Sequence, residues 1–305
     1  MKYLSLCFVA LFCIGQVTLF AQDDSQVIAV EADTTQQSLL WKVSHDDLDQ
    51  PSYVFGTIHM IGKEDYFFTD QMKAAFDESD NIVFEINMED MTDLSAQMSM
   101  MGKVFMSDGK TLRDLLTEEE YEIVAAHFKE MGLPLMFLER MKPMFLSVFA
   151  STDLSPNSLQ SGEVMSYEME LMKAAKNKKK TMGGLETMEF QMGLFDSIPY
   201  DAQAKMLLES IQVSDDSNDQ YQQMVQLYKD QNIEAMQSMA TAEDGGLEDY
   251  ESILLTQRNE NWIPLMKEMM VEGTTFFAVG AGHLGGEKGV IKLLRKAGYT
   301  LEPIR

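Results

Sequence analysis

The chain has 305 residues, 45% of them hydrophobic, and a formal net charge of −25 at pH 7. These values are typical of a globular protein, and the length suffices for one large domain or two small ones with a real hydrophobic core. Proteins bind nucleic acids mainly through Lys and Arg, so a chain this acidic is not expected to bind nucleic acid.

Residues 1–21 are typical of a cleavable signal peptide. Lys2 supplies a positive charge, the stretch Leu4–Leu19 is largely apolar, and Ala21 is a small residue before the first acidic run. The apolar stretch is interrupted and shorter than the roughly 20 residues that a membrane-spanning helix needs, so we expect cleavage and no transmembrane anchor afterwards. The chain then divides into a signal peptide (1–21), a flexible leader (22–37) and a folded part (38–305) of a periplasmic or secreted protein.

Both cysteines, Cys7 and Cys13, lie inside the predicted signal peptide. The mature chain would therefore hold no disulfide, no cysteine metal ligand and no cysteine nucleophile. This composition favours a bacterial envelope protein.

Strand patterns occur first near the start of the folded part. Two apolar runs, 39–43 and 53–55, flank a polar turn and predict a β-hairpin. A helix over 69–78 then leads to a third strand over 81–86. The chain next becomes helical.

The middle of the chain is dominated by helical patterns. An acidic first turn after Thr117 opens one helix, as the helix dipole favours, and further helices are predicted over 134–150 and 161–175. The Met-rich stretch between Met98 and Met106 has two interpretations. Methionines at helical spacing are more often core filler, but they could also form an adaptable contact surface, for example for a homodimer.

Strand patterns return towards the C-terminus. A strand-like segment over 180–183 follows a basic cluster, and after more helices the chain closes with a strand over 274–279, a helix over 287–297 and a last strand over 299–301. We therefore predict an α/β fold with a single domain, in which N- and C-terminal strands share one sheet and a long helical middle region caps it.

Two of the four histidines stand in the same local frame. Gly56-Thr57-Ile58-His59 and Gly280-Ala281-Gly282-His283 each follow an apolar strand with a glycine, two residues and a histidine. Open α/β folds bind ligands at the edge where strands end, and imidazole there can ligate a metal or act as general acid or base. The alternative is that each is a hydrogen-bonded structural histidine.

Carboxylates and a cation are available beside these histidines. Glu85 interrupts the apolar strand 81–86, and Glu186 follows another strand. Two imidazoles, one carboxylate and an open position form the ligand set of a hydrolytic metal site. Arg258 could bind a substrate carboxylate or an oxyanion, or it could belong to a surface ion pair.

One further motif has a different interpretation. The segment 280–285 fits the dinucleotide-binding fingerprint, with Glu302 at about the right distance downstream. We reject it because the unit lies at the extreme C-terminus with no second βαβ half, and because an exported protein would meet little NAD.

Several segments, in this order, carry a resemblance to a known family. They are Leu40-Trp41-Lys42-Val43, Phe55-Gly56-Thr57-Ile58-His59, Val83-Phe84-Glu85, Gly184-Leu185-Glu186-Thr187 with Gln191, Arg258-Asn259, and Val279-Gly280-Ala281-Gly282-His283-Leu284 with Gly286 and Gly289. Together they resemble the TraB/GumN family over about residues 38–305. That family is similar to the animal Tiki proteins, described as metal-dependent proteases that rely on paired G-x-x-H motifs and an acidic residue.

The resemblance implies roles for particular residues. His59 and His283 would take the histidine roles and Glu85 the acidic one, while Glu186 and Arg258 would line the same site. At Glu168 the relatives tend to have an aspartate, so no role is carried over to that position. Related ChaN-like and erythromycin-esterase-like proteins suggest that this architecture also hosts haem binding and metal-independent hydrolysis.

The leading hypothesis is a metal-dependent hydrolase, most plausibly a peptidase. His59, His283 and Glu85 would hold a divalent ion (Zn, Mn or Co), with Glu85, Glu186 and Arg258 as catalytic residues acting on a peptide or small-molecule substrate. Two alternatives stay open at this point. One is a metal-independent hydrolase with a histidine base oriented by a glutamate, and the other is a non-catalytic envelope protein that binds haem or a peptide.

Overall fold

The computed structural model describes residues 37–88, 98, 102–150, 163–212, 214–240 and 250–305. The predicted signal peptide and almost all of the predicted leader lie outside these residues, as do Met100 and Met101 of the Met-rich stretch. Among the helices within these ranges, none is long and apolar enough to cross a membrane.

The centre of the molecule is a mixed β-sheet. Its strands are β1 (Leu40–Ser44), β2 (Ser52–Thr57), β4 (Asn81–Ile86), β6 (Thr181–Glu186), β7 (Thr275–Gly280) and β8 (Thr300–Ile304). In the described part of the chain they form one sheet in the spatial order β6-β4-β7-β2-β1-β8. The first four strands of that order are parallel, whereas β1 is antiparallel to both β2 and β8. A small separate pair joins β3 (Ile61–Gly62) to β5 (Val164–Met165).

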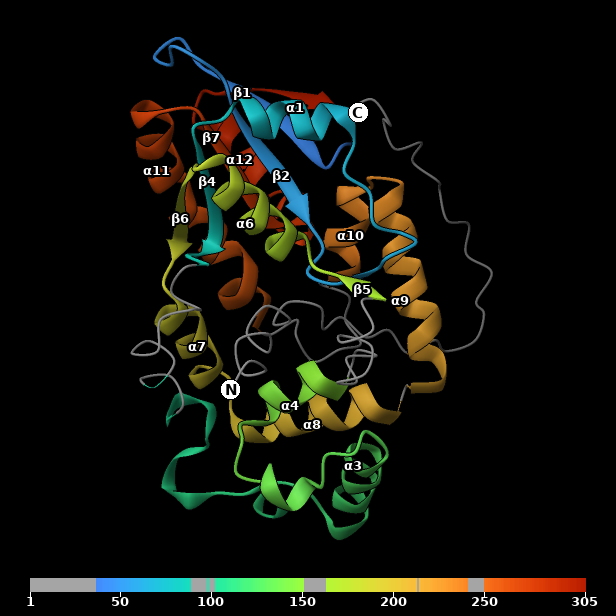
Figure 1. Cartoon of the computed structure of the whole chain (residues 1–305). Coiled ribbons are helices and arrows are strands. Elements are labelled where there is room, and N and C mark those ends of the chain that lie inside the picture. Colours follow the sequence, from blue (N-terminus) through green and yellow to red (C-terminus); the bar gives the residue numbers. More distant parts are fainter. Residues whose placement is uncertain (1–36, 89–97, 99–101, 151–162, 213, 241–249) are drawn as a thin grey trace, which may run out of the picture.

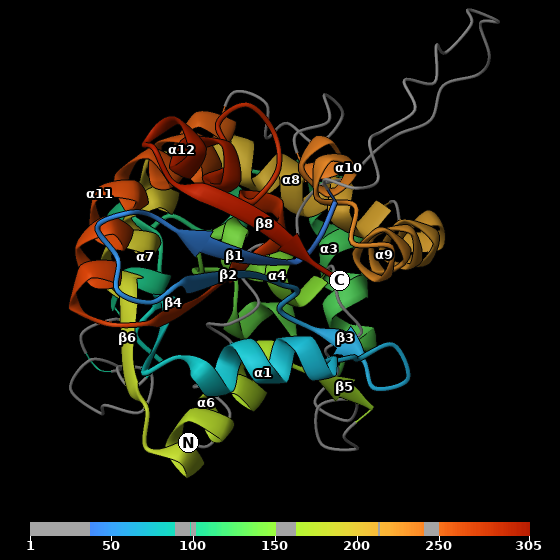
Figure 2. The ribbon, with the colours of Figure 1, turned by 90° about the horizontal axis from the view of Figure 1, so that it is seen from above.

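Helices lie on both faces of this sheet and beyond its carboxyl edge. They are α1 (Asp70–Glu78), α3 (Glu118–Glu130), α4 (Pro143–Ala150), α6 (Tyr167–Lys178), α7 (Met188–Asp196), α8 (Tyr200–Gln212), α9 (Ser214–Lys229), α10 (Ile233–Ala240), α11 (Gln257–Glu272) and α12 (Val290–Lys296). Seen from above, α1 and α6 cover one face and α11 and α12 the other (Figure 2). Helices α3, α4 and α8 lie beyond the carboxyl ends of the strands (Figure 1), around a second hydrophobic cluster that includes Leu112, Phe128, Leu146 and Leu207.

The predicted fold class is confirmed, with two differences of detail. The sheet does combine N- and C-terminal strands, but the middle of the chain also contributes β6 to its edge. The helix predicted over 134–150 is shorter in the structure, where helix α4 begins only at Pro143. Proline is suited to the first turn of a helix and not to its interior. The acidic helix start after Thr117 is confirmed as a reciprocal capping box with Glu120.

The register of the parallel strands determines where the chemistry lies. Thr57 at the end of β2 pairs with Gly280 at the end of β7, and Ile86 at the end of β4 pairs with Glu186 at the end of β6. The carboxyl ends of four neighbouring strands therefore meet at one edge of the sheet. Open α/β sheets bind their ligands at this edge.

The glycines after β7 are required by close packing. A Cβ atom built on Gly285 would lie 2.3 Å from the carbonyl oxygen of Ile233, at the start of α10. A Cβ on Gly289 would lie 2.0 Å from the carbonyl oxygen of Gly285. These contacts account for the glycine-rich loop without a dinucleotide.

Replacement of Gly285 by alanine should therefore destabilise the fold. We expect Gly285→Ala to lower the free energy of unfolding by about 1–3 kcal/mol, the usual cost of overpacking, as measured by urea denaturation. Gly193→Ala is the matched control, because a Cβ on that glycine inside α7 would meet nothing within 4 Å. It should be neutral or stabilising by up to about 1 kcal/mol. Equal effects of the two substitutions would contradict this packing account.

Candidate functional site

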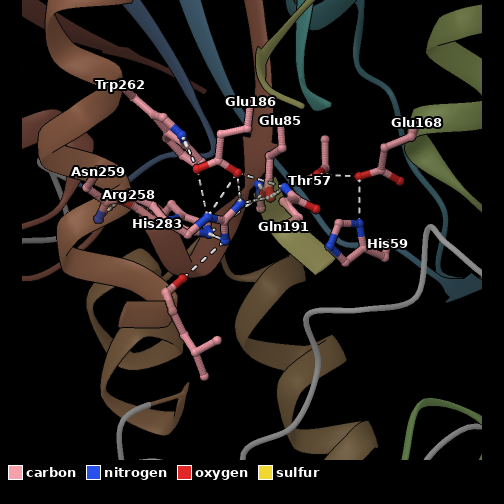
Figure 3. Close-up of polar contacts among 12 residues, drawn as sticks. Thr57, His59, Glu85, Glu168, Glu186, Gln191, Arg258, Asn259, Trp262 and His283 are labelled. Atoms are coloured by element: carbon pink, nitrogen blue, oxygen red, sulfur yellow. Dashed lines mark hydrogen bonds and ion pairs between the residues drawn. The ribbon is translucent and has the colours of Figure 1, made fainter. Parts of the chain in front are cut away.

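The predicted site residues gather at the carboxyl edge of the sheet. Glu85 lies on β4, Glu186 ends β6, and His283 lies in the single helical turn Ala281–His283 after β7. His59 follows the end of β2. Figure 3 shows two groups of side chains here, a cluster around Arg258 and a pair formed by His59 and Glu168.

Arg258 lies at the centre of the first group, which we call the arginine cluster (Glu85, Glu186, Arg258 and His283). Its Nε donates to both carboxylate oxygens of Glu186, at 2.9 and 3.1 Å. Its Nη2 donates to Oε2 of Glu85 at 2.7 Å and to Oε2 of Glu186 at 2.8 Å. Its Nη1 donates to the carbonyl oxygen of Leu254 at 3.1 Å and lies 3.2 Å from Nε2 of His283. The guanidinium is fully buried, and these contacts engage all of its N–H groups.

The local sequence explains why an arginine can be buried here. Arg258 lies in the first turn of α11, directly after the π-helical turn Ser252–Thr256, and this position turns its side chain towards the strand ends (Figure 3). One turn later Trp262 donates its indole N–H to Oε1 of Glu186 at 2.7 Å. A buried charge is tolerated only when it is paired and hydrogen-bonded, which both carboxylates achieve for Arg258.

The two carboxylates of the arginine cluster are held by further donors. The backbone N–H of Gly280 donates to Oε1 of Glu85 at 2.8 Å. The amide of Gln191 on α7 donates to Oε2 of Glu186 at 2.9 Å and to Oε2 of Glu85 at 3.3 Å. Glu85 is therefore fixed by neighbours on β7, α7 and α11, and Glu186 by neighbours on α7 and α11.

The protonation of His283 follows from its neighbour Asn259. The Asn259 side-chain amide donates to the carbonyl oxygen of Lys288 at 2.9 Å, so its oxygen is the atom that faces Nδ1 of His283 at 2.6 Å. Nδ1 therefore carries the proton and Nε2 presents its lone pair to Arg258. Burial, together with the charge of Arg258, lowers the pKa of His283 to about 3, so the ring is neutral at pH 7.

Burial by itself would raise the pKa of Glu85, but the guanidinium of Arg258 outweighs this effect and lowers it far below its ordinary value. Glu85 therefore stays ionised at neutral pH beside the buried guanidinium of Arg258.

The second group is the histidine pair (His59 and Glu168). Nδ1 of His59 lies 3.0 Å from Oε1 of Glu168, which also accepts a hydrogen bond from the hydroxyl of Thr57 at 2.7 Å. The other oxygen of Glu168 accepts from Ser166, the N-cap of α6, at 3.1 Å. Because a carboxylate only accepts, Nδ1 of His59 is the protonated nitrogen and Nε2 is the basic one. The His59 side chain is 14% exposed, against 1% for His283.

Opposing effects act on the basicity of His59. Burial would lower the pKa of His59, but the carboxylates of Glu168 and Glu85 raise it above its ordinary value of 6.5. A histidine in this state is a stronger base than a free imidazole. The pair thus has the features of a general base with an orienting carboxylate.

Three further residues, Thr57, Glu168 and Asn259, belong to the site although no role was predicted for them. Glu168, to which no role was carried over, is the partner of His59, and Thr57, inside the first G-x-x-H motif, holds that glutamate. Asn259, next to Arg258, sets the tautomer of His283. Thr57 and Asn259 lie inside motifs that the sequence shows, but their contacts could not be predicted from it. The contacts of Glu168 could not be predicted either, because α6 and the end of β2 meet only through tertiary packing.

Comparisons with known proteins identify the family. The family model described as TraB/PrgY/gumN matches residues 39–303. The chain belongs to this family. The TraB/PrgY/gumN match covers every element of the sheet except the end of β8 and includes both G-x-x-H motifs.

Curated relatives of this TraB/PrgY/gumN chain are named metalloproteases. It is 23% identical to Metalloprotease TIKI1 of Danio rerio over 87% of the chain and 63% of that protein. It is 25% identical to Metalloprotease TIKI1 of Xenopus tropicalis, over 95% of the chain and 66% of that protein. The human Metalloprotease TIKI1 is 24% identical, over 87% and 61%. The chain thus spans slightly less than two thirds of these relatives, and no solved structure matches it.

The predicted metal ligands do not fit a metal ion in this arrangement. Nδ1 of His283 is protonated and hydrogen-bonded to Asn259, and the lone pair on its Nε2 faces Arg258. A metal held by His283 and Glu85 would lie beside the guanidinium, where two positive charges repel. Within the described ranges, no group of three or more His, Cys, Asp and Glu side chains is arranged to hold a metal. The metal site stays a prediction from the sequence.

Proposed function

We propose that the protein is a hydrolase of peptide bonds with His59 as its general base. The observation that carries this proposal is the histidine pair: Nδ1 of His59 is held by Glu168, which leaves the basic Nε2 at the carboxyl edge of the sheet. An imidazole oriented by a carboxylate is the usual activator of a nucleophile in acyl transfer. The names of the curated relatives support the choice of a peptide substrate.

The proposed reaction needs one proton relay. Nε2 of His59 accepts a proton from water, and the resulting hydroxide attacks the substrate carbonyl carbon. The tetrahedral intermediate then collapses, the C–N bond breaks, and Nε2–H returns the proton to the leaving amine. Water and peptide are thereby converted into a carboxylic acid and an amine.

The glutamates stabilise the charge that this relay creates. His59 becomes an imidazolium in the first step, and the carboxylates of Glu168 and Glu85 both favour its charged form. Charge stabilisation by fixed groups in a water-poor site is a major part of catalysis. We assign Arg258 a positioning role, because its N–H groups are engaged by protein acceptors and a substrate would have to displace one of them.

A peptide library tests this function. The purified folded protein is incubated with the library and new termini are identified by mass spectrometry. Cleavage at defined positions supports the proposal. No cleavage of any peptide, with haem or an intact peptide bound instead, would favour the non-catalytic binding protein.

The pH dependence of cleavage tests the histidine pair. The base acts in its neutral form, so kcat/KM should rise with pH through the pKa of His59, which lies above 6.5. Glu168→Gln removes the carboxylate that raises this pKa, so we expect a lower kcat/KM and an acidic limb displaced to lower pH. An acidic limb that stays in place in Glu168→Gln would contradict the assignment of His59 as the titrating base.

A further inference from the structure

The arginine cluster has the composition of a metal site but contains its own cation. Three donor atoms converge on the guanidinium: Oε2 of Glu85 at 2.7 Å, Oε2 of Glu186 at 2.8 Å and Nε2 of His283 at 3.2 Å. Two carboxylates and one neutral imidazole nitrogen form a set that proteins use to bind zinc.

We infer that Arg258 takes the position of a metal ion in this site, so that the wild-type protein needs no metal for hydrolysis and its arginine cluster excludes divalent metals. This inference deepens the proposed hydrolase function and rests on it only for the part that concerns activity.

The geometry explains how the guanidinium keeps a metal ion out. A guanidinium is planar and keeps its charge, and its forked donors match the two carboxylates and the imidazole together. A divalent metal could reach the same donors only after the guanidinium had left. That step would break hydrogen bonds of a fully buried charge, which is costly.

The surroundings of the cluster are fixed independently of Arg258. Glu85 is held by the backbone N–H of Gly280, Glu186 by the indole of Trp262, and His283 by the side chain of Asn259. In a variant without the guanidinium these partners would still orient the three donors. Removal of the arginine should therefore create a metal-binding site.

Metal binding tests the inference without reference to activity. The protein, prepared without a histidine tag, is analysed for metals and titrated with Zn²⁺ by calorimetry, together with Arg258→Ala and Arg258→Lys. Wild type should carry no stoichiometric metal. Arg258→Ala should bind Zn²⁺ at least about tenfold more tightly than wild type, whereas Arg258→Lys, which keeps a cation, should not. Circular dichroism checks that each variant is folded.

Three results would overturn the inference. They are stoichiometric metal in wild type that is absent from His283→Ala, equal Zn²⁺ affinity of wild type and a folded Arg258→Ala, and loss of wild-type cleavage after chelation that added Zn²⁺ or Mn²⁺ restores. If Arg258→Ala does not fold, the wild-type metal content decides alone. Absence of cleavage in all conditions would refute the proposed function and leave the metal measurements as the test of this inference.

Discussion

Replacement of His59 by alanine is expected to lower kcat/KM for a cleaved peptide by about 100- to 10,000-fold, the usual contribution of a general base. His59 is the more exposed member of the histidine pair. The alanine variant has no basic atom in place of its Nε2. The free energy of unfolding should change little in His59→Ala. The measurement is the initial rate of cleavage at several substrate concentrations.

The control for this substitution is another histidine of the same chain. His45 follows β1, which runs antiparallel to β2, so it lies at the opposite edge of the sheet from His59. His45→Ala should leave kcat/KM within a factor of about two, as expected for a group outside the reaction. If His59→Ala retained wild-type cleavage, His59 could not be the base.

Replacement of Arg258 by methionine is expected to lower the free energy of unfolding by about 3–5 kcal/mol, because it leaves buried carboxylates without their cation. Arg258 is fully buried and joins the carboxylates of Glu85 and Glu186. Urea or guanidinium denaturation, followed by circular dichroism, measures the change in the absence of added metal.

A surface arginine provides the comparison. Arg113 pairs with Glu118 and Glu139, but its side chain is 52% exposed. Arg113→Met should cost less than about 1 kcal/mol, as is usual for exposed ion pairs. A second change, Glu85→Gln in the Arg258→Met background, should recover part of the lost stability because it neutralises one unpaired carboxylate. Similar losses for the two arginine variants would contradict a buried cluster centred on Arg258.

Local sequence patterns predicted the main features of the fold. The apolar runs that became β1 and β2, and the strand around Glu85, could be recognised because alternating and apolar runs report local structure directly. The strand β6 was expected only over 180–183 and extends to Glu186. The break before Pro143 was missed because the apolar pattern continues through it.

The candidate site could be predicted in its members but not in its contacts. His59, His283, Glu85, Glu186 and Arg258 were all visible from motifs at strand or helix ends, and the register of the parallel strands brings them to one edge. Which partner each side chain contacts depends on how α6 and α11 pack against that edge. For this reason Glu168 was left without a role, and Arg258 was expected to contact substrate.

Cleavage in heavy-oxygen water tests whether His59 activates the water that attacks the peptide bond. Peptides are incubated with wild type and His59→Ala in water enriched in heavy oxygen, with a chelator present, and the products are analysed by mass spectrometry. We expect new carboxyl termini that carry one heavy oxygen from the solvent in wild type, and almost none of them in His59→Ala. Unlabelled products, or equal labelling by the two proteins, would contradict this role of His59.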